Sequence, residues 1–191
     1  MTNYPNWFNG RVAQLNFEKF LLAYAGQEVN FLQIGAYTGD ATEWLFANIL
    51  TNQNSTLTDV DTWEGSDEPA HDQLNWLNVE DTYDLRTLKF QNENRLFKHK
   101  MMSDSFFAND AKSYDFIYID GDHKASSVLQ DGINAIARLK PGGIIAFDDY
   151  QWSLGKGPAF EPKPAIDAIR LCYADSLTVF ELEYQAWMTK H

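Results

Sequence analysis

Short apolar runs alternate with stretches of helical periodicity along most of the chain. This alternation is typical of a parallel β-sheet covered by helices, because the connection between neighbouring parallel strands has the length of a helix. Strands are predicted at 30–34, 56–60, 96–101, 115–119 and 144–147, with a terminal strand pair at 178–183 and 186–189. Helices are predicted at 16–25, 40–50, 126–139 and 165–173. We therefore expect an α/β fold containing right-handed βαβ units.

Segment 64–84 interrupts this alternation with seven acidic residues and no Lys or Arg. Two interpretations remain open. The segment is either solvated, with a helix near 72–77, or it forms a lid that favours a cationic cofactor or substrate.

Length and composition narrow the class of protein. The 191 residues fit one domain, 1–191, and a hydrophobic content of 45% supplies one core. The net charge of −12 disfavours binding to nucleic acid or anionic membranes, which requires clustered cations. The single cysteine, Cys172, forms no internal disulfide, and Met1–Gly10 lacks the pattern of a secretory leader. We expect a soluble cytoplasmic protein, whose oligomeric state the sequence does not indicate.

The first two predicted strands end in residues that suit a nucleoside ligand, at the edge where an open parallel sheet binds its ligands. Gly35 and Gly39 allow a sharp turn and let a ligand approach the N–H groups that begin the next helix, although packing alone could also require them. The carboxylate of Asp61, after the second strand, can accept two hydrogen bonds from a ribose diol. The G-x-x-x-G spacing differs from G-x-G-x-x-G, which argues against a nicotinamide enzyme.

Asp120, Asp148 and Asp149 follow the fourth and fifth predicted strands, which we expect to be neighbours. Three carboxylates converging at one edge repel one another unless a cation binds, and all-oxygen ligation suits magnesium or calcium. Alternatively, these residues cap helices and turns. His123, three residues after Asp120, is either an ordinary residue at a helix start or a general base beside a metal-bound hydroxyl.

Four motifs together resemble the class I S-adenosylmethionine-dependent methyltransferases. The more specific similarity is to small bacterial O-methyltransferases related to catechol O-methyltransferase and to macrolide-sugar O-methyltransferases. The motifs are LQIGAYTG at 32–39, DTWEG at 61–65, IDGDH at 119–123 and GGIIAFDDY at 142–150. The resemblance extends from Phe31 to Lys190. It implies a Rossmann-like, doubly wound, mostly parallel seven-stranded sheet with an antiparallel C-terminal strand pair.

The resemblance also implies the cofactor, S-adenosylmethionine, and the roles of single residues. The glycine turn surrounds the methionine part, Asp61 binds the ribose, and Ser103 and Asp104 lie beside the adenine. In metal-dependent relatives Asp120, Asp148 and Asp149 hold Mg²⁺, and His123 takes the substrate proton, so that His123 and Asp120 are the predicted catalytic pair. The predicted cofactor site comprises Gln33, Gly35, Ala36, Tyr37, Gly39, Asp61, Thr62, Ser103, Asp104, Asp120 and Gly121.

The sequence departs from the family pattern at three places. Gln33 replaces the usual acidic residue at the end of the first strand, and we expect weaker cofactor binding because an amide contributes no charge. The Asp148–Asp149 pair differs from the Asp-Asn or Glu-Asp pairs of well-known metal-dependent members. The segment before the first strand is short, so we expect it to cover less of the site. Trp63, Tyr150 and Trp152 are predicted to form an apolar wall.

The leading hypothesis is methyl transfer to an oxygen of a small hydroxylated molecule, such as a sugar or a phenol, with assistance from Mg²⁺. Three alternatives stay open. The first is a metal-independent methyltransferase that uses His123 alone, and the second is a non-catalytic S-adenosylmethionine-binding module, suggested by Gln33. The third is a nucleotide-dependent oxidoreductase.

Overall fold

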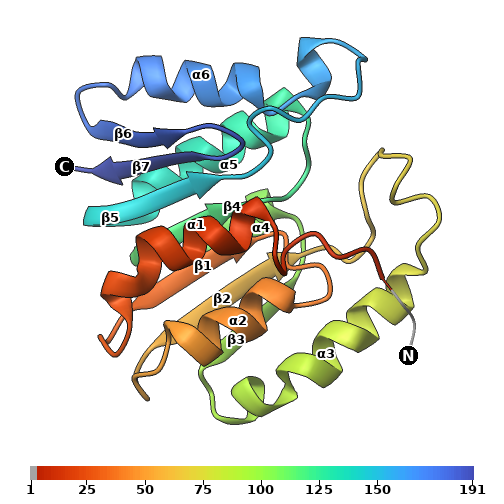
Figure 1. Cartoon of the computed structure of the whole chain (residues 1–191), viewed down its shortest axis with the longest axis vertical. Helices are drawn as coiled ribbons and strands as arrows, with labels where there is room; N and C mark the ends of the chain where they lie inside the picture. The colour runs from red at the N-terminus through yellow and green to blue at the C-terminus, as the bar shows by residue number, and fades with distance from the viewer. Residues whose placement is uncertain (1–3) are drawn as a thin grey trace.

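A computed structural model describes residues 4–191, so the predicted absence of a leader in Met1–Gly10 lies partly outside the described residues. Its centre is a seven-stranded sheet with the order β3-β2-β1-β4-β5-β7-β6 (Figure 1). Strands β1 to β5 are parallel, and β7 pairs antiparallel with both β5 and β6. The strands are β1 Asn30–Ile34, β2 Thr56–Asp61, β3 Leu96–Lys100, β4 Tyr114–Ile119, β5 Leu139–Phe147, β6 Leu177–Leu182 and β7 Ala186–Lys190.

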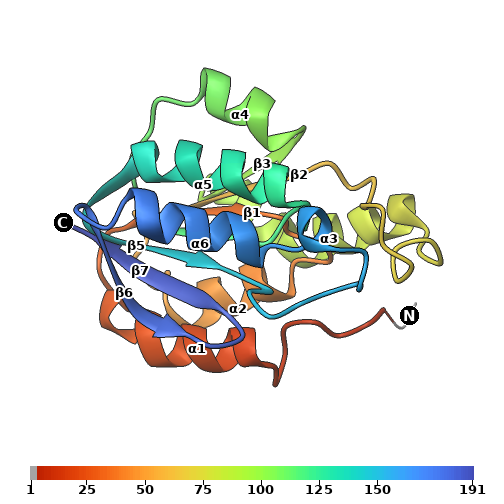
Figure 2. The ribbon, with the colours of Figure 1, turned by 90° about the horizontal axis from the view of Figure 1, so that it is seen from above.

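Helices cover both faces of the sheet (Figure 2). Helices α1 to α3 pack on one face, and α4 to α6 pack on the other. The helices are α1 Val12–Leu21, α2 Asp40–Asn48, α3 Trp76–Asn92, α4 Ser103–Asn109, α5 Ala125–Arg138 and α6 Lys163–Cys172, with short 3-10 turns at Leu22–Tyr24 and Pro158–Phe160. Among residues 4–191, no helix is long and apolar enough to cross a membrane.

Each face of the sheet buries its own hydrophobic cluster. On the α1 face, Phe17 meets Phe116, Tyr118 and Trp187 edge to face, with ring centroids 5.0–5.8 Å apart. On the other face, α5 and α6 bury aliphatic residues against β4 and β5. Because the parallel strands are covered on both sides, they read in sequence as continuous apolar runs.

The predicted fold class is confirmed, and so are the seven strands, to within a few residues at most ends. Two helices were not predicted at their full extent. Helix α3 spans Trp76–Asn92, whereas the sequence indicated a helix only near 72–77, because the exposed Leu77, Leu85 and Leu88 obscure the buried stripe of Val79, Tyr83 and Thr87. Helix α4, which is short and begins at Ser103, was not predicted at all. Strand β5 begins at Leu139 and continues through the glycine pair that was expected to precede it.

The turn after β1 fixes how closely the ends of three strands approach one another. The Gly35 N–H donates to the carbonyl of Val60 on β2 at 2.9 Å, and the Asp120 N–H donates to the carbonyl of Ile34 at 2.8 Å. Gly35 has a φ of +87°, and a Cβ there would lie 1.9 Å from the carbonyl oxygen of Asp120. Only glycine therefore allows the β1 turn to lie against the end of β4.

A buried carboxyl group lies beneath this turn. Asp59 on β2 is fully buried, and its Oδ2 accepts hydrogen bonds from Thr42 Oγ1 at 2.6 Å and from the Tyr83 hydroxyl at 2.8 Å. Its Oδ1 has no partner among the described residues. Burial is the main cause that raises the pKa of Asp59 to about 7. Asp59 thus connects α2 and α3 to the sheet through these hydrogen bonds. The bonds offset only part of the free-energy cost of ionising a buried carboxyl group.

Replacing Asp59 with Asn should remove a pH dependence of stability. Between about pH 4 and pH 7, the folded wild type binds the Asp59 proton more tightly than the unfolded chain does, so its free energy of unfolding falls as pH rises. Asn does not titrate. The free energy of unfolding of Asp59→Asn, measured with urea and taken relative to wild type, should increase by roughly 1–3 kcal/mol as the pH rises from 4.5 to 7.5. A difference that stays constant across this range would contradict the raised pKa.

Because Gly35 contacts Asp120, adding one methyl group at position 35 should lower the stability of the fold strongly. Gly35→Ala should lower the free energy of unfolding by about 2 kcal/mol or more, because the Cβ collides with backbone. Gly142→Ala is the matched control, since Gly142 has a φ of +79° but open space around a Cβ. That variant should lose only about 1 kcal/mol from backbone strain. Equal losses would show that the close approach of the two turns is not what requires glycine.

Candidate active site

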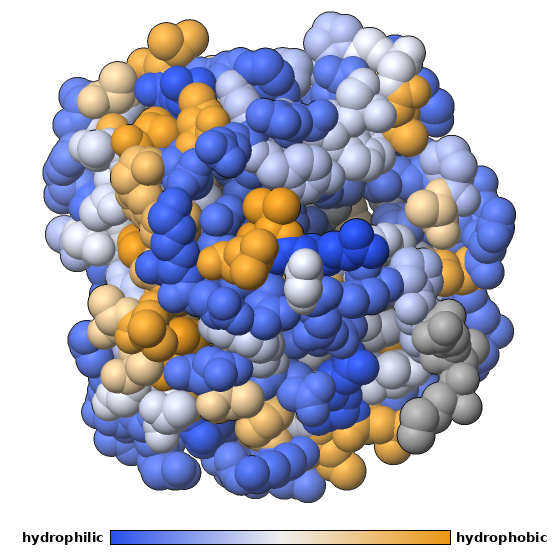
Figure 3. Space-filling model, in the orientation of Figure 1, coloured by the Kyte–Doolittle hydropathy of each residue, from blue (hydrophilic) through white to orange (hydrophobic). Residues whose placement is uncertain are grey.

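A cavity of about 850 Å³ opens at the carboxyl ends of the parallel strands. Figure 3 shows this face hollowed to the right of its centre, where those strand ends lie in Figure 1. Thirteen of the fourteen predicted site residues line it: Gln33, Gly35, Ala36, Tyr37, Asp61, Thr62, Ser103, Asp104, Asp120, Gly121, His123, Asp148 and Asp149. Gly39 does not. It caps the N-terminus of α2 with a φ of +79° and lies against Tyr83.

Asp61 holds the turn after β1 in place. Its Oδ2 accepts the N–H groups of Ala36 at 2.7 Å and Tyr37 at 3.0 Å, and its Oδ1 accepts the N–H of Trp63 at 2.8 Å. A carboxylate offers about four acceptor positions, so about one remains for a ligand. Tyr37 itself has a φ of +49°, a conformation that non-glycine residues rarely adopt. The turn is therefore held by side-chain hydrogen bonds as well as by its glycines.

Gln33 presents an unused acceptor next to the cavity. Its side chain is 3% exposed, and its Nε2 donates to the carbonyl of Gly35 at 2.7 Å. Its Oε1 has no hydrogen-bond partner among the described residues. An unpaired buried carbonyl is costly, so a ligand that donates a hydrogen bond here would be favoured.

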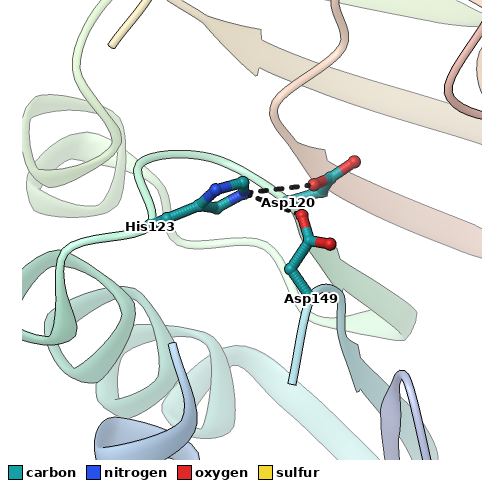
Figure 4. A group of neighbouring side chains, drawn as sticks. All are labelled: Asp120, His123 and Asp149. Atoms are coloured by element: carbon teal, nitrogen blue, oxygen red, sulfur yellow. Dashed lines mark ion pairs between the residues drawn. The ribbon is translucent and has the colours of Figure 1, made fainter. Parts of the chain in front are cut away.

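Asp120, His123 and Asp149 form a cluster on the cavity wall (Figure 4). The Nε2 of His123 lies 3.0 Å from Oδ2 of Asp149 and 4.0 Å from Oδ1 of Asp120. Asp120 closes β4, His123 lies on the loop before α5, and Asp149 follows β5 with a φ of +56°. Each of the three residues offers one ligand atom, and these atoms all lie within 4.8 Å of one another. The cluster could therefore hold a metal ion.

Asp148 points to different partners from its neighbour Asp149. Its Oδ2 accepts a hydrogen bond from the Tyr118 hydroxyl, and its Oδ1 accepts from Nε2 of Gln185 at 3.0 Å and from the N–H of Asp149 at 2.8 Å. Burial and the charge of Asp149 raise the pKa of Asp148 to about 6. The geometry therefore groups His123, and not Asp148, with Asp120 and Asp149.

Carboxylates surround the ring of His123. Burial disfavours the imidazolium, but ion pairs with Asp120, Asp149 and Glu68 outweigh burial and raise the pKa of His123 to about 12. Burial, with the charge of Asp148, raises the pKa of Asp120 well above its usual range. In this arrangement the imidazolium neutralises part of the negative charge. A bound cation would do the same, and would leave Nε2 free of its proton.

Several cavity residues were not identified from the sequence. Trp7 of the N-terminal segment packs against Tyr37 and His71, with ring centroids 4.3 and 5.4 Å apart, so this short segment does cover part of the site. Glu68 and Tyr184 also line the cavity. Glu68 belongs to the acidic segment 64–84, whereas no local signal distinguishes Trp7 or Tyr184.

The predicted apolar wall is correct for Trp152 and wrong for the other two residues. Trp152 lines the cavity and meets the His123 ring at a centroid distance of 4.5 Å. Trp63 is 2% exposed, packs on Tyr83 and donates its Nε1 hydrogen to the carbonyl of Tyr37. Tyr150 is buried against α6 and donates to Asp167. Both residues are buried in packing contacts, Trp63 against α3 and Tyr150 against α6, and so do not line the cavity.

Known structures with this fold include methyltransferases with different acceptors. A Clostridium thermocellum protein provisionally named an rRNA methylase has a TM-score of 0.70 at 10% identity, covering 96% of this chain and 98% of its own. An O-methyltransferase from Bacillus cereus, solved in complex with SAH, has a TM-score of 0.65 at 17% identity, covering 97% and 84%. The O-methyltransferase of tomaymycin synthesis from Streptomyces achromogenes, solved in complex with SAM, has a TM-score of 0.66 at 13% identity, covering 94% and 81%. At these identities the likeness establishes the fold.

Membership of a family rests on the sequence. No curated protein matches the chain significantly. The family model described as a methyltransferase domain matches residues 32–150, a range that runs from β1 past the end of β5 and includes Asp61, Asp120, His123 and both aspartates after β5. Since this match covers more than half of the 191 residues, the chain belongs to the methyltransferase-domain family.

Proposed function

We propose that this methyltransferase transfers the methyl group of S-adenosylmethionine to an oxygen of a small hydroxylated acceptor, such as a sugar or a phenol. The observation that carries the proposal is that the glycine turn, Asp61 and the cluster of Asp120, His123 and Asp149 line one cavity. The solved O-methyltransferases from Bacillus cereus and Streptomyces achromogenes, which share the fold, hold SAH and SAM respectively. We also propose that residues 1–191 act as one domain in the cytoplasm.

The residues of β1 and β2 would bind the cofactor. The free Oε1 of Gln33 would accept a hydrogen bond from the cofactor ammonium, and the remaining acceptor position of Asp61 would bind a ribose hydroxyl. Ser103 and Asp104, at the start of α4, would lie beside the adenine. The remaining predicted contacts are Gly35, Ala36, Tyr37, Thr62, Asp120 and Gly121, all on the cavity wall.

The acceptor would lie near His123, and the charge of the cavity limits what it can be. The cavity wall carries many carboxylates, among them Asp67, Asp122 and Asp149, and the whole chain has a net charge of −12. Anionic acceptors, nucleic acid included, would be repelled. A neutral hydroxylated molecule therefore fits better than a phosphate-rich one, which separates this chain from the rRNA methylase of similar fold.

The cluster also fits a divalent cation: its two carboxylates suit Mg²⁺, whereas the imidazole of His123 would favour a transition metal if it served as a ligand. Bound there, the ion would supply Lewis-acid chemistry that lowers the pKa of an acceptor hydroxyl. Asp120 and Asp149 would be its carboxylate ligands, whereas Asp148 would have to give up hydrogen bonds to join them. His123 would either take the hydroxyl proton at Nε2 or serve as the third ligand through the same atom. A metal-independent reaction that uses His123 alone is the alternative.

Two substitutions separate cofactor binding from methyl transfer. Asp61→Ala should weaken the affinity for SAH at least about tenfold, because the β1 turn loses two hydrogen bonds and the loop after β2 loses one, along with the ribose contact. His123→Ala should keep SAH affinity and lower methyl transfer about 10²- to 10⁴-fold. Isothermal titration with SAH, and transfer from labelled S-adenosylmethionine to a panel of sugars, phenols and short RNAs, provide the two measurements. Tight SAH binding without transfer to any acceptor would favour a non-catalytic binding module.

Removal of metal tests the role of the cluster. If Mg²⁺ assists the reaction, EDTA should abolish transfer and added Mg²⁺ should restore it. Binding of Mn²⁺, followed by its electron paramagnetic resonance signal, then assigns His123. His123→Ala should weaken Mn²⁺ binding about 10- to 100-fold if the ring is a ligand, and should leave it unchanged if the ring is only a base. Full activity in EDTA would establish the metal-independent alternative.

A further inference from the structure

Two adjacent acidic side chains connect segment 65–75 to the loop between β4 and α5. Asp67 pairs with Lys124, and Oε1 of Glu68 lies 3.1 Å from Nδ1 of His123. Segment 65–75 is the long connection between β2 and α3, far in sequence from His123 (Figure 1). These contacts attach it to the loop that carries the ring of His123.

The two ion pairs differ in exposure. The side chain of Asp67 is 80% exposed, and an ion pair in water contributes little to stability. The side chain of Glu68 is only 11% exposed. Its Oε1 also accepts a hydrogen bond from Ser66 Oγ at 2.7 Å. The carboxylate of Glu68 is thus buried and held by a second hydrogen bond while it lies beside the ring of His123.

The backbone around Glu68 is held as firmly as its side chain. The N–H of His71 donates to the Glu68 carbonyl at 2.9 Å, and the N–H of Ser66 donates to Nδ1 of His71 at 3.0 Å. The His71 ring in turn contacts Trp7 and Trp76, with centroids 5.4 and 5.0 Å apart. Glu68 therefore reaches His123 from a turn that is held by hydrogen bonds and by ring contacts.

The two ring nitrogens of His123 face opposite sides. Nδ1 is buried and makes no regular hydrogen bond among the described residues, but Oε1 of Glu68 lies 3.1 Å from it. Nε2 lies 3.0 Å from Oδ2 of Asp149 and 4.0 Å from Oδ1 of Asp120. A carboxylate next to one ring nitrogen keeps the proton on that nitrogen and fixes the orientation of the ring. Trp152 packs against the ring edge to face, which limits its movement further.

We propose that Glu68 is a positioning residue for methyl transfer: its carboxylate accepts the Nδ1 hydrogen of His123 and thereby directs Nε2 into the cavity. This assignment rests on the proposed function, in which Nε2 meets the acceptor or the cation. It holds for either role of His123, because both use Nε2. It also gives segment 65–75 a part in the site, since the ring is oriented only when that segment is in place.

The hydrogen on Nδ1 of His123 is the direct readout. In ¹⁵N-labelled protein with SAH bound, it should give a resolved, slowly exchanging proton signal, assigned by its disappearance in His123→Gln. Glu68→Ala should lose that signal to exchange with water. Glu68→Gln, whose amide still offers an acceptor, should shift it. The matched control is Asp67→Ala, which removes the neighbouring exposed ion pair and should leave the signal unchanged.

Turnover and SAH affinity complete the test. Glu68→Ala should lower kcat about 10- to 100-fold with SAH affinity unchanged, and Glu68→Asp should restore part of the loss. An unchanged SAH affinity also shows that the variant is folded. A signal that persists in Glu68→Ala, or a kcat that does not change, would overturn the assignment. Failure of the wild type to bind SAH would instead overturn the proposed function, and the Nδ1 proton signal would then be compared among the same variants without SAH.

Discussion

The close approach of two backbone turns determines the geometry of the site. The carbonyl of Asp120 occupies the space where any other residue at position 35 would place its Cβ. Because hydrogen bonds fix the ends of β1, β2 and β4 relative to one another, Gly35, Asp61 and Asp120 meet at one edge of the sheet. Three separate parts of the chain thus contribute residues to the site. Their relative positions depend on a backbone contact that leaves no room for a side chain at position 35.

Charge is the second constraint on the site. The cavity collects carboxylates whose mutual repulsion destabilises the folded state unless protons, imidazolium or a cation compensate. Neighbouring carboxylates are stabilised by different partners. Asp148 receives hydrogen bonds from Tyr118 and Gln185, whereas Asp149 pairs with His123. Two adjacent aspartates consequently have different environments, and Asp149 is the one that lies beside His123.

Much of the fold could be predicted from the sequence because buried parallel strands and their terminal residues leave strong local signals. The turn from Gly35, Asp61 and the aspartates after β4 and β5 were found in this way, and all line the cavity. Helix α3 was predicted only in part because its buried stripe is narrow and three leucines, Leu77, Leu85 and Leu88, lie on its exposed face. The partners of His123 depend on long-range contacts. That Glu68 reaches Nδ1, or that Gln185 reaches Asp148, follows from the tertiary arrangement and not from the local pattern.

Gln185 links opposite ends of the polypeptide to the site. Its Oε1 accepts hydrogen bonds from Asn16 at 2.8 Å and from Trp187 at 2.9 Å, while its Nε2 donates to Asp148. Residue 185 precedes β7, which inserts between β5 and β6. Asn16 and Gln185 are 169 positions apart, and their hydrogen bond forms only when α1 and the turn before β7 are both in place. The environment of Asp148 therefore depends on the assembled β5-β7-β6 edge of the sheet and on the helix that covers it.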